Sequence, residues 1–438
     1  MRHWHGGLGF SLSLVVGLGL GCSATSAKPT GAGGGSSVTG AGGDGGGFTT
    51  GPGSGGSGGA ESCATFSAAA KQASAAMLFV LDGSASMNQQ GKWNTAQLAV
   101  VQAIDEDVFD TMSLGLMIFP DSFVAAPACL AIFGVTQVSC GIPKKGNIQV
   151  PVAAAGTTKS NGATGVRHDV YQKLLFTGPL SNSDDGSPIY DALAVGYDVV
   201  KGQNVDKRIV VLVTDGGFSC TSVANPPRAG DPDGANCPDW EIPDTVNKLI
   251  NDARLDPVAS VNTFVVGVPG SDSHGEVQGA FDTPKYHMKL ALSTYAVSGA
   301  PDTIDPACDK SLPFSKNGFD PIKPCHIDLS SGANFNPDSL ANAIAAIRGK
   351  ALGCLYSLPD PPPGKTIDLK LVNVVATVGG VKTPIPKRSN PADDCVKDGC
   401  WDYTDTQQVQ LIGKACADVS AATDAAVNIT VGCATILK

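Results

Sequence analysis

Positive charge, long apolar runs and catalytic motifs are all scarce in this sequence. The 438 residues carry a net charge of −10 at pH 7, and the sequence pI is near 5.0. Because nucleic-acid binding needs a basic surface for the phosphates, this balance argues against a nucleic-acid partner. The apolar run at 8–20 has 13 residues. A membrane-spanning helix needs about 20, and no later run is long enough.

Recognisable catalytic sequences are missing as well. The residues around Ser84 and Ser86 do not form a G-x-S-x-G nucleophile elbow, and no G-x-x-x-x-G-K-[ST] phosphate loop is present. No nucleophile–base pair can be assembled from the sequence, so we do not expect an enzyme. Four histidines lack the spacing of metal ligands and are interpreted as surface or packing residues: His168, His274, His287 and His326.

The composition nevertheless belongs to a folded protein. Charged residues make up only 16 % of the chain and hydrophobic residues 42 %. A fully disordered chain has low hydrophobicity and high charge, so these values exclude one. The length suits two or three domains. Shifts in composition divide the chain into segments 1–27, 28–61, 62–353 and 354–438.

Segment 1–27 has the features of an export signal. Arg2 supplies a positive charge ahead of the apolar run. The end of that run, Gly19-Leu20-Gly21-Cys22, resembles a bacterial lipobox, which implies lipidation of Cys22. We therefore expect a cell-envelope lipoprotein, in the outer membrane or at the surface, whose only contact with the membrane is this anchor. Cleavage after Thr25-Ser26-Ala27 is the alternative, and it predicts a secreted or periplasmic protein.

Segment 28–61 is interpreted as a flexible spacer. Sixteen of the thirty residues at 31–60 are glycine, and serine, threonine and alanine make up most of the rest. Such a chain behaves as a coil that spans roughly 30 Å. A spacer of this kind would hold a folded domain away from a lipid anchor.

The cysteine count fits an oxidising compartment. Of 13 cysteines, 12 remain once Cys22 is set aside, which allows six disulfides. A zinc site is the alternative, but Cys395 and Cys400 are the only closely spaced pair. The pairs expected to close short insertions are Cys129–Cys140, Cys220–Cys237 and Cys308–Cys325, and Cys354–Cys433 would close segment 354–438.

Segment 62–353 alternates strand and helix patterns. The apolar run 77–81 ends at Asp82, and the run 208–213 ends at Thr214 and Asp215. Continuous apolar runs are typical of strands buried on both faces of a parallel sheet. Strands are also predicted at 114–119, 261–268 and 325–329, and helices at 93–109, 189–201, 241–253, 285–296 and 337–351. This order predicts an α/β fold with a doubly wound, mostly parallel sheet.

Polar residues gather where these strands end. Asp82, Ser84 and Ser86 form an Asp-x-Ser-x-Ser pattern directly after the first strand. Ser187 precedes a predicted helix, and Asp215 follows the strand at 208–213. Ligands of doubly wound sheets bind outside the carboxyl ends of the strands. The sequence therefore predicts a binding site at this edge.

These three loops resemble those of the von Willebrand factor type A domain, which has a Rossmann-like fold and a metal-ion-dependent adhesion site. The resemblance implies that Ser84 and Ser86 coordinate a metal directly, that Asp82 and Asp215 hold coordinated waters, and that Ser187 replaces the family's usual threonine. Asp184 and Asp185 would add negative charge nearby.

Hydroxyl and carboxylate oxygens suit Mg²⁺ above all, or Ca²⁺ or Mn²⁺. Such an ion can keep an open position for an acidic side chain of a partner. Asp-x-Ser at a helix start is also a common capping arrangement, in which case the serines only cap the helix.

Segment 354–438 is predicted to be a small disulfide-rich β module. It holds five cysteines, and strands are expected at 367–378, 409–412 and 426–431. Trp401 and Tyr403 are interpreted as core aromatics, with a binding patch as the alternative.

The sequence as a whole predicts an exported cell-envelope adhesion protein. It would engage a protein or extracellular-matrix ligand through a divalent cation. The alternative is an envelope structural or assembly scaffold whose metal site is incidental or vestigial.

Overall fold

The computed structural model describes the chain from Phe66 to Lys438 with several gaps. The predicted signal, the spacer, Cys22, Asp184 and Asp185 lie outside the described residues. The gaps within 66–438 are 127–130, 132–133, 181–185, 217–242, 273, 276–285, 311–319, 353, 362, 365, 391, 405–406 and 422–424.

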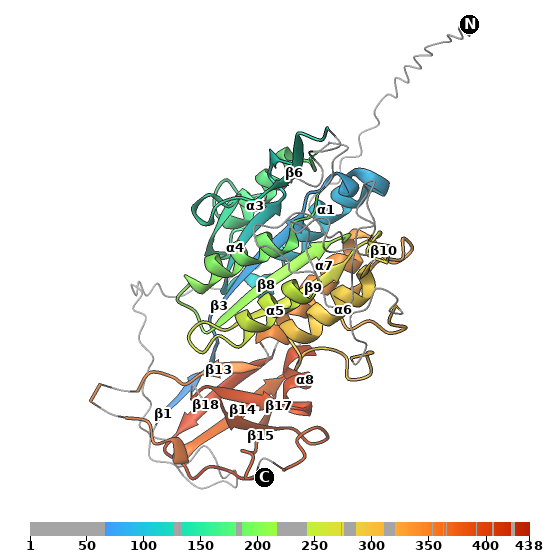
Figure 1. Ribbon diagram of the computed structural model, residues 1–438. Coiled ribbons are helices and arrows are strands. Elements are labelled where there is room, and N and C mark those ends of the chain that lie inside the picture. Colours follow the sequence, from blue (N-terminus) through green and yellow to red (C-terminus); the bar gives the residue numbers. More distant parts are fainter. Residues whose placement is uncertain are drawn as a thin grey trace, which may run out of the picture. The chain divides into compact units, whose positions relative to one another are not determined.

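A six-stranded sheet forms the centre of the larger domain (Figure 1). Its strand order is β12-β9-β8-β3-β4-β7. The β3 strand pairs in parallel with both β4 and β8, and only the β7 edge strand is antiparallel to its neighbour. The strands are β3 (Ala75–Asp82), β4 (Met112–Phe119), β7 (Val150–Ala154), β8 (Lys207–Thr214), β9 (Val261–Gly267) and β12 (Ile327–Asp328).

The central strand shows why the apolar runs are continuous. All eight residues of β3 are buried. Met77 and Phe79 pack into one hydrophobic cluster, while Leu78 and Val80 pack into the other. Since side chains alternate between the two faces of a strand, both faces of this sheet are covered.

Helices cover the sheet on both faces. The helices α1 (Lys92–Ile104), α3 (Val166–Phe176) and α7 (Pro337–Leu352) contribute to the first cluster. The second cluster includes α4 (Ile189–Lys201), α5 (Pro243–Arg254) and α6 (Met288–Gly299). The predicted α/β fold with a doubly wound, mostly parallel sheet is confirmed.

Shorter elements surround this framework. A 3-10 helix, η1 (Ala85–Gly91), precedes α1, and η2 (Asp107–Phe109) and η3 (Lys145–Asn147) lie in later connections. The strands β5 (Ser122–Ala125) and β6 (Gln137–Gly141) form an antiparallel pair, as do β10 (His274–Gly275) and β11 (Tyr286–His287). Among the described residues, no helix has the length and apolarity needed to cross a bilayer.

Two four-stranded sheets and one α-helix make up the C-terminal segment. Their strand orders are β1-β18-β14-β15 and β16-β17-β13-β2, so two strands from before β3 complete them. Residues 66–72 therefore pair with the C-terminal segment, although the sequence division placed them in segment 62–353. The elements are β1 (Phe66–Ala69), β2 (Lys71–Gln72), β13 (Leu355–Ser357), η5 (Leu369–Leu371), β14 (Val372–Val378), β15 (Val381–Ile385), β16 (Cys400–Tyr403), β17 (Val409–Ile412), α8 (Lys414–Ala421) and β18 (Ala426–Val431).

Disulfides join cysteines in both parts of the described chain. Cys308 bonds to Cys325, as predicted. Cys354 bonds to Cys416, so the predicted Cys354–Cys433 pair is wrong. The reason is that β13 pairs with β17, and α8, which follows β17, carries Cys416 to within 5.5 Å of Cys354 between their Cα atoms. Cys395 bonds to Cys400, which removes both from a zinc site. Cys140 and Cys433 are disulfide-bonded as well.

The aromatic residues of β16 belong to the core. Trp401 is fully buried. The ring of Tyr403 meets it edge to face, with 5.0 Å between the ring centroids. This confirms the interpretation of Trp401 as a core aromatic, while Tyr403 is partly buried and packs against the same cluster.

Candidate metal site

Adjacent parallel strands bring the two aspartates of the predicted site together. Asp82 is the last residue of β3, and Asp215 directly follows β8. Leu81 is paired with Val213, so both strands reach the carboxyl edge of the sheet at the same level. Asp82 is fully buried and Asp215 is 5 % exposed. Carboxylates buried this deeply require hydrogen bonds or a cation.

Hydrogen bonds hold both oxygens of the Asp82 carboxylate. The backbone N–H of Ser84 donates to Oδ1 at 2.9 Å. The Thr214 hydroxyl donates to Oδ2 at 2.5 Å and accepts the backbone N–H of Gly216 at 2.9 Å. Thr214 therefore links the two strand ends. This role of Thr214 was not predicted, although its position beside Asp215 after an apolar strand was a usable signal.

The two serines connect to the second aspartate. The hydroxyl oxygens of Ser84 and Ser86 are 2.9 Å apart, and the Ser86 hydroxyl donates to Asp215 Oδ1 at 3.1 Å. Within the described chain, Ser84 occupies the N-cap position directly before η1, but its side chain makes no capping hydrogen bond. The capping alternative for Ser84 is therefore not what the structure contains.

Lysine 92 is a member of the site that the sequence analysis missed. Its Nζ forms an ion pair with Asp215 Oδ2, and the lysine is 4 % exposed at the first position of α1. Gly270, which has a φ of +109°, lies against this pair. A Cβ on Gly270 would be 3.4 Å from both Lys92 Nζ and Asp215 Cβ. The loop after β9 thus closes over the ion pair.

The charges of the site are unbalanced. Burial, and after it the charge of the Asp215 carboxylate, raises the pKa of Asp82 to about 8, although hydrogen bonds from Thr214 and Ser84 act to lower it. Lys92 supplies one positive charge beside two carboxylates. The site therefore favours an additional positive charge, which a proton or a metal ion can provide.

The structure places Ser187 less directly. It is 4 % exposed and lies two residues before α4. Among the described residues, no hydrogen bond joins it to Asp82, Ser84, Ser86 or Asp215. A Cβ on the preceding Gly186 would be 2.7 Å from Cys140 Sγ, so the loop packs closely on the disulfide-bonded Cys140.

The donor set fits a hard divalent cation. Neighbouring ligands of an octahedral Mg²⁺ with bonds of about 2.1 Å are separated by about 2.9 Å. The 2.9 Å between the hydroxyl oxygens of Ser84 and Ser86 matches that spacing, and the Ser86 hydroxyl donates to Asp215 Oδ1 at 3.1 Å, which suits an aspartate that holds the ion through water. The described residues contain no cluster of three or more His, Cys, Asp and Glu suited to a metal, as expected when two of the ligands are serines. Lys92 is the feature that does not suit a metal.

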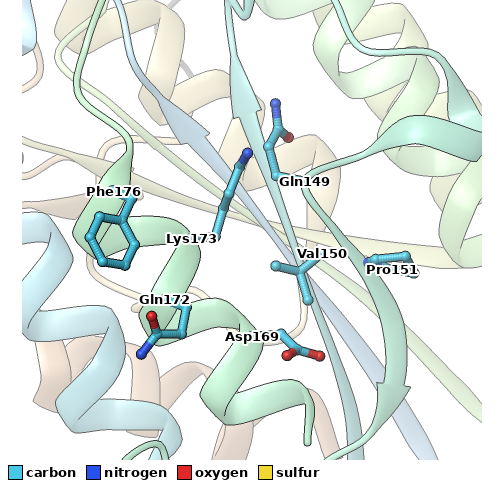
Figure 2. A pocket seen from close by; sticks show the side chains of 7 residues that line it. All are labelled: Gln149, Val150, Pro151, Asp169, Gln172, Lys173 and Phe176. Carbon is cyan, nitrogen blue, oxygen red and sulfur yellow. The ribbon is translucent and has the colours of Figure 1, made fainter. Parts of the chain in front are cut away.

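Hollows on the described surface lie outside this site, and two of them share lining residues. One of about 370 Å³ lies between α3 and the region of β7, and Figure 2 shows Lys173, Phe176 and Gln149 among the side chains around it. The other, of about 420 Å³, shares Gln149 and Lys173. The second hollow is connected to the loop that follows β3 in the candidate metal site, because Leu180 on its lining donates its backbone N–H to the Gly83 carbonyl at 2.9 Å.

Comparisons with known proteins give distant structural similarity only. A scan against protein-family models found no match, and neither did a search of curated proteins. Solved structures that resemble the chain include the pilus adhesin SpaC from Lactobacillus rhamnosus GG, at 10 % identity and a TM-score of 0.38. That match covers 83 % of this chain and 40 % of SpaC, so the chain spans less than half of that structure's length.

Two further similar structures are a vWF domain and a protein with a MIDAS motif. The vWF domain of the type V pili tip protein Mfa5 from Porphyromonas gingivalis is 10 % identical, with 67 % of this chain and 99 % of that chain covered and a TM-score of 0.35. Proximal thread matrix protein 1 from the mussel byssus, with a zinc-occupied MIDAS motif, is 13 % identical, with 65 % and 50 % covered and a TM-score of 0.31. TM-scores this low are too distant to transfer residues, ligands or function.

Proposed function

We propose that this chain is an exported adhesion protein that holds a divalent cation at the carboxyl edge of its α/β sheet. The ligands would be Ser84 and Ser86 directly, with Asp82 and Asp215 through water. Ser187 would complete the set. The observation that carries the proposal is the row of oxygens from Ser84 through Ser86 to Asp215, separated by 2.9 and 3.1 Å. Mg²⁺ is the preferred ion, with Ca²⁺ and Mn²⁺ as the alternatives.

A cation held in this way serves binding better than catalysis. Ligands that are hydroxyls and water-linked carboxylates leave the ion with residual positive charge. An acidic side chain of a protein or matrix partner can take an open position and form a charge-assisted bond. The proposed role is therefore adhesion in the manner of a type A domain, without an enzymatic step.

The proposed setting is the cell envelope. The signal at 1–27 would export the chain, lipidation of Cys22 would anchor it, and the glycine-rich spacer would hold the domain away from the membrane. Disulfides at Cys308–Cys325 and Cys354–Cys416 support an oxidising compartment. Plain secretion or a periplasmic location is the alternative.

A second function is favoured by one specific contact. Lys92 already provides Asp215 with a cation, so the edge of the sheet can be held together without a metal. In that case the chain would be an envelope structural or assembly scaffold, and any metal would be incidental.

Binding to a surface that carries carboxylates distinguishes the adhesion proposal from the scaffold alternative. The full chain is passed over immobilised poly-L-glutamate in 5 mM Mg²⁺ or in EDTA, with poly-L-glutamine as the matched neutral surface. (These polymers are probes for an acidic partner.) The adhesion proposal predicts retention on polyglutamate in Mg²⁺ only, and its loss in Ser86→Ala. Because the chain has a net charge of −10, non-specific attraction to polyglutamate is disfavoured. Equal binding in EDTA, or none in either buffer, would favour the scaffold.

A further inference from the structure

Lys92 occupies a position that local interactions make unfavourable for a lysine. It is the first residue of α1, where the helix dipole is positive and repels a cation. The preceding Gly91 has a φ of +70°, and the helix start has no side-chain cap among the described residues. Lysine is also among the residues most rarely buried. Its burial at 4 % exposure therefore requires compensation from a nearby negative charge.

Asp215 supplies that compensation. The lysine Nζ bonds to Oδ2 of Asp215, while the Ser86 hydroxyl donates to Oδ1. One carboxylate thus joins the ammonium to the row of oxygens that carries the proposed metal site. A Cβ on Gly270 would lie 3.4 Å from Lys92 Nζ and from Asp215 Cβ, so the loop after β9 leaves little space beside the ion pair.

A divalent ion and an ammonium compete in such a place. Both are cations, both are attracted to Asp215, and they repel each other at short range. Asp82, the other carboxylate of the proposed ligand set, is bonded to Thr214 and the Ser84 backbone and not to Lys92. Asp215 is therefore the group for which the two cations compete.

We propose that the Lys92 ammonium is a tethered cation of this site, which holds Asp215 in the metal-free protein and must move away for a divalent ion to bind tightly. The inference rests on the proposed metal site and adds a built-in competitor to it. It implies that the site stays assembled without metal and that Lys92 weakens metal binding. It also implies that Lys92 becomes more accessible when a divalent ion enters.

Calorimetric titration of Mn²⁺ into the full chain tests the competition. The variants are Lys92→Met, which removes the charge at similar length, and Lys248→Met. Lys248 is a matched control, because its side chain is 74 % exposed and pairs with Asp252 on the same helix. We expect Lys92→Met to bind Mn²⁺ about tenfold or more tightly than the wild type, as the loss of a unit charge near a divalent ion implies. Lys248→Met should match the wild type.

Several outcomes separate this inference from the proposed function. Equal Mn²⁺ affinity in the wild type and Lys92→Met, with binding lost in Asp215→Ala, overturns the tethered cation and leaves the metal site standing. No saturable binding in the wild type or in Lys92→Met overturns both. Binding in Lys92→Met but not in the wild type supports the competition in its strongest form.

A second measurement needs no variant and so does not depend on Lys92→Met folding. The wild-type chain is treated with an amine-acetylating N-hydroxysuccinimide ester, and peptides are quantified by mass spectrometry with and without 10 mM Mn²⁺. We expect Lys92 to be modified much more slowly than exposed Lys248 without Mn²⁺. Mn²⁺ should raise the Lys92 rate at least severalfold relative to Lys248. An unchanged ratio contradicts displacement of the lysine.

Discussion

Asp215→Ala should destabilise the metal-free protein strongly, because it removes the partner of a buried ammonium. The side chains of Lys92 and Asp215 are 5 % and 3 % exposed, and Nζ of the lysine bonds to Oδ2 of the aspartate. Removing one member of a buried ion pair costs about 3–5 kcal/mol, since the remaining charge is held where water cannot solvate it. The same substitution should abolish binding of a divalent cation.

The variant should still fold at room temperature. Native proteins unfold with free energies of about 5–15 kcal/mol, so a loss of this size lowers the melting temperature more than it removes the fold. At roughly 2–4 °C per kcal/mol for a domain of a few hundred residues, the expected decrease is roughly 6–20 °C.

Urea unfolding in EDTA, followed by circular dichroism, measures this loss. The proteins are the wild type, Asp215→Ala, Lys92→Met and the double variant. Because the double variant removes both charges, it should recover most of the stability that Asp215→Ala loses. The exposed-pair control Lys248→Met should stay within about 0.5 kcal/mol of the wild type. A free energy of unfolding for Asp215→Ala within about 1 kcal/mol of the wild type would contradict this prediction, as would a double variant in which the two single losses simply add.

Three further predictions concern other contacts. Thr214→Val should lower the free energy of unfolding by about 1–3 kcal/mol, since Asp82 Oδ2 and the Gly216 N–H both lose a buried partner. Urea unfolding measures this loss with the exposed Ser331→Ala as the control, and equal free energies of unfolding for the two variants would contradict it. Burial lowers the pKa of His326 from 6.5 to about 4, so the unfolded chain takes up a proton at a higher pH than the folded chain does. The free energy of unfolding should therefore fall by up to about 3 kcal/mol as the pH drops from 6.5 to 4, and unfolding curves of His326→Leu across that range should lack this dependence. The double variant Cys354→Ser/Cys416→Ser opens a disulfide with a sequence separation of 62 and should lose about 4 kcal/mol in the unfolding of the C-terminal segment; an unchanged transition would contradict this.

The sheet was predictable because its strands are buried on both faces. The runs in β3 and β8 are continuous and apolar, and each ends in a polar residue at the sheet edge. The helix α3 lacked such a pattern, because fully buried Arg167 sits among its core positions. That arginine pairs with Asp110 at 2.8 Å, a partner from a different part of the chain.

Pairings between residues far apart in the sequence could not be predicted from local sequence patterns. Strand β1 pairs with β18, with Phe66 opposite Val431, and nothing in residues 66–69 indicates a partner so far along the chain. The bond between Cys354 and Cys416 has the same origin, since it depends on the pairing of β13 with β17. Cysteine order alone could not distinguish Cys416 from Cys433.

Most residues of the candidate site could be predicted from the positions at which strands end. Asp82, Ser84, Ser86 and Asp215 come together because adjacent parallel strands end at one edge. The place of Lys92 in the site was not predicted, since a lysine in a helix is ordinarily a solvated residue. Its position at the start of α1, against the helix dipole, was the available signal.

The most direct test of the account is whether the serine hydroxyls bind a divalent ion. Mn²⁺ and Mg²⁺ are titrated by calorimetry into the full chain, into Ser86→Ala and into Ser331→Ala, whose serine is exposed and is not one of the proposed ligands. We expect one saturable site in the wild type, unchanged in Ser331→Ala and at least about tenfold weaker in Ser86→Ala. Equal affinity in Ser86→Ala, or no saturable binding in either the wild type or Lys92→Met, would contradict it.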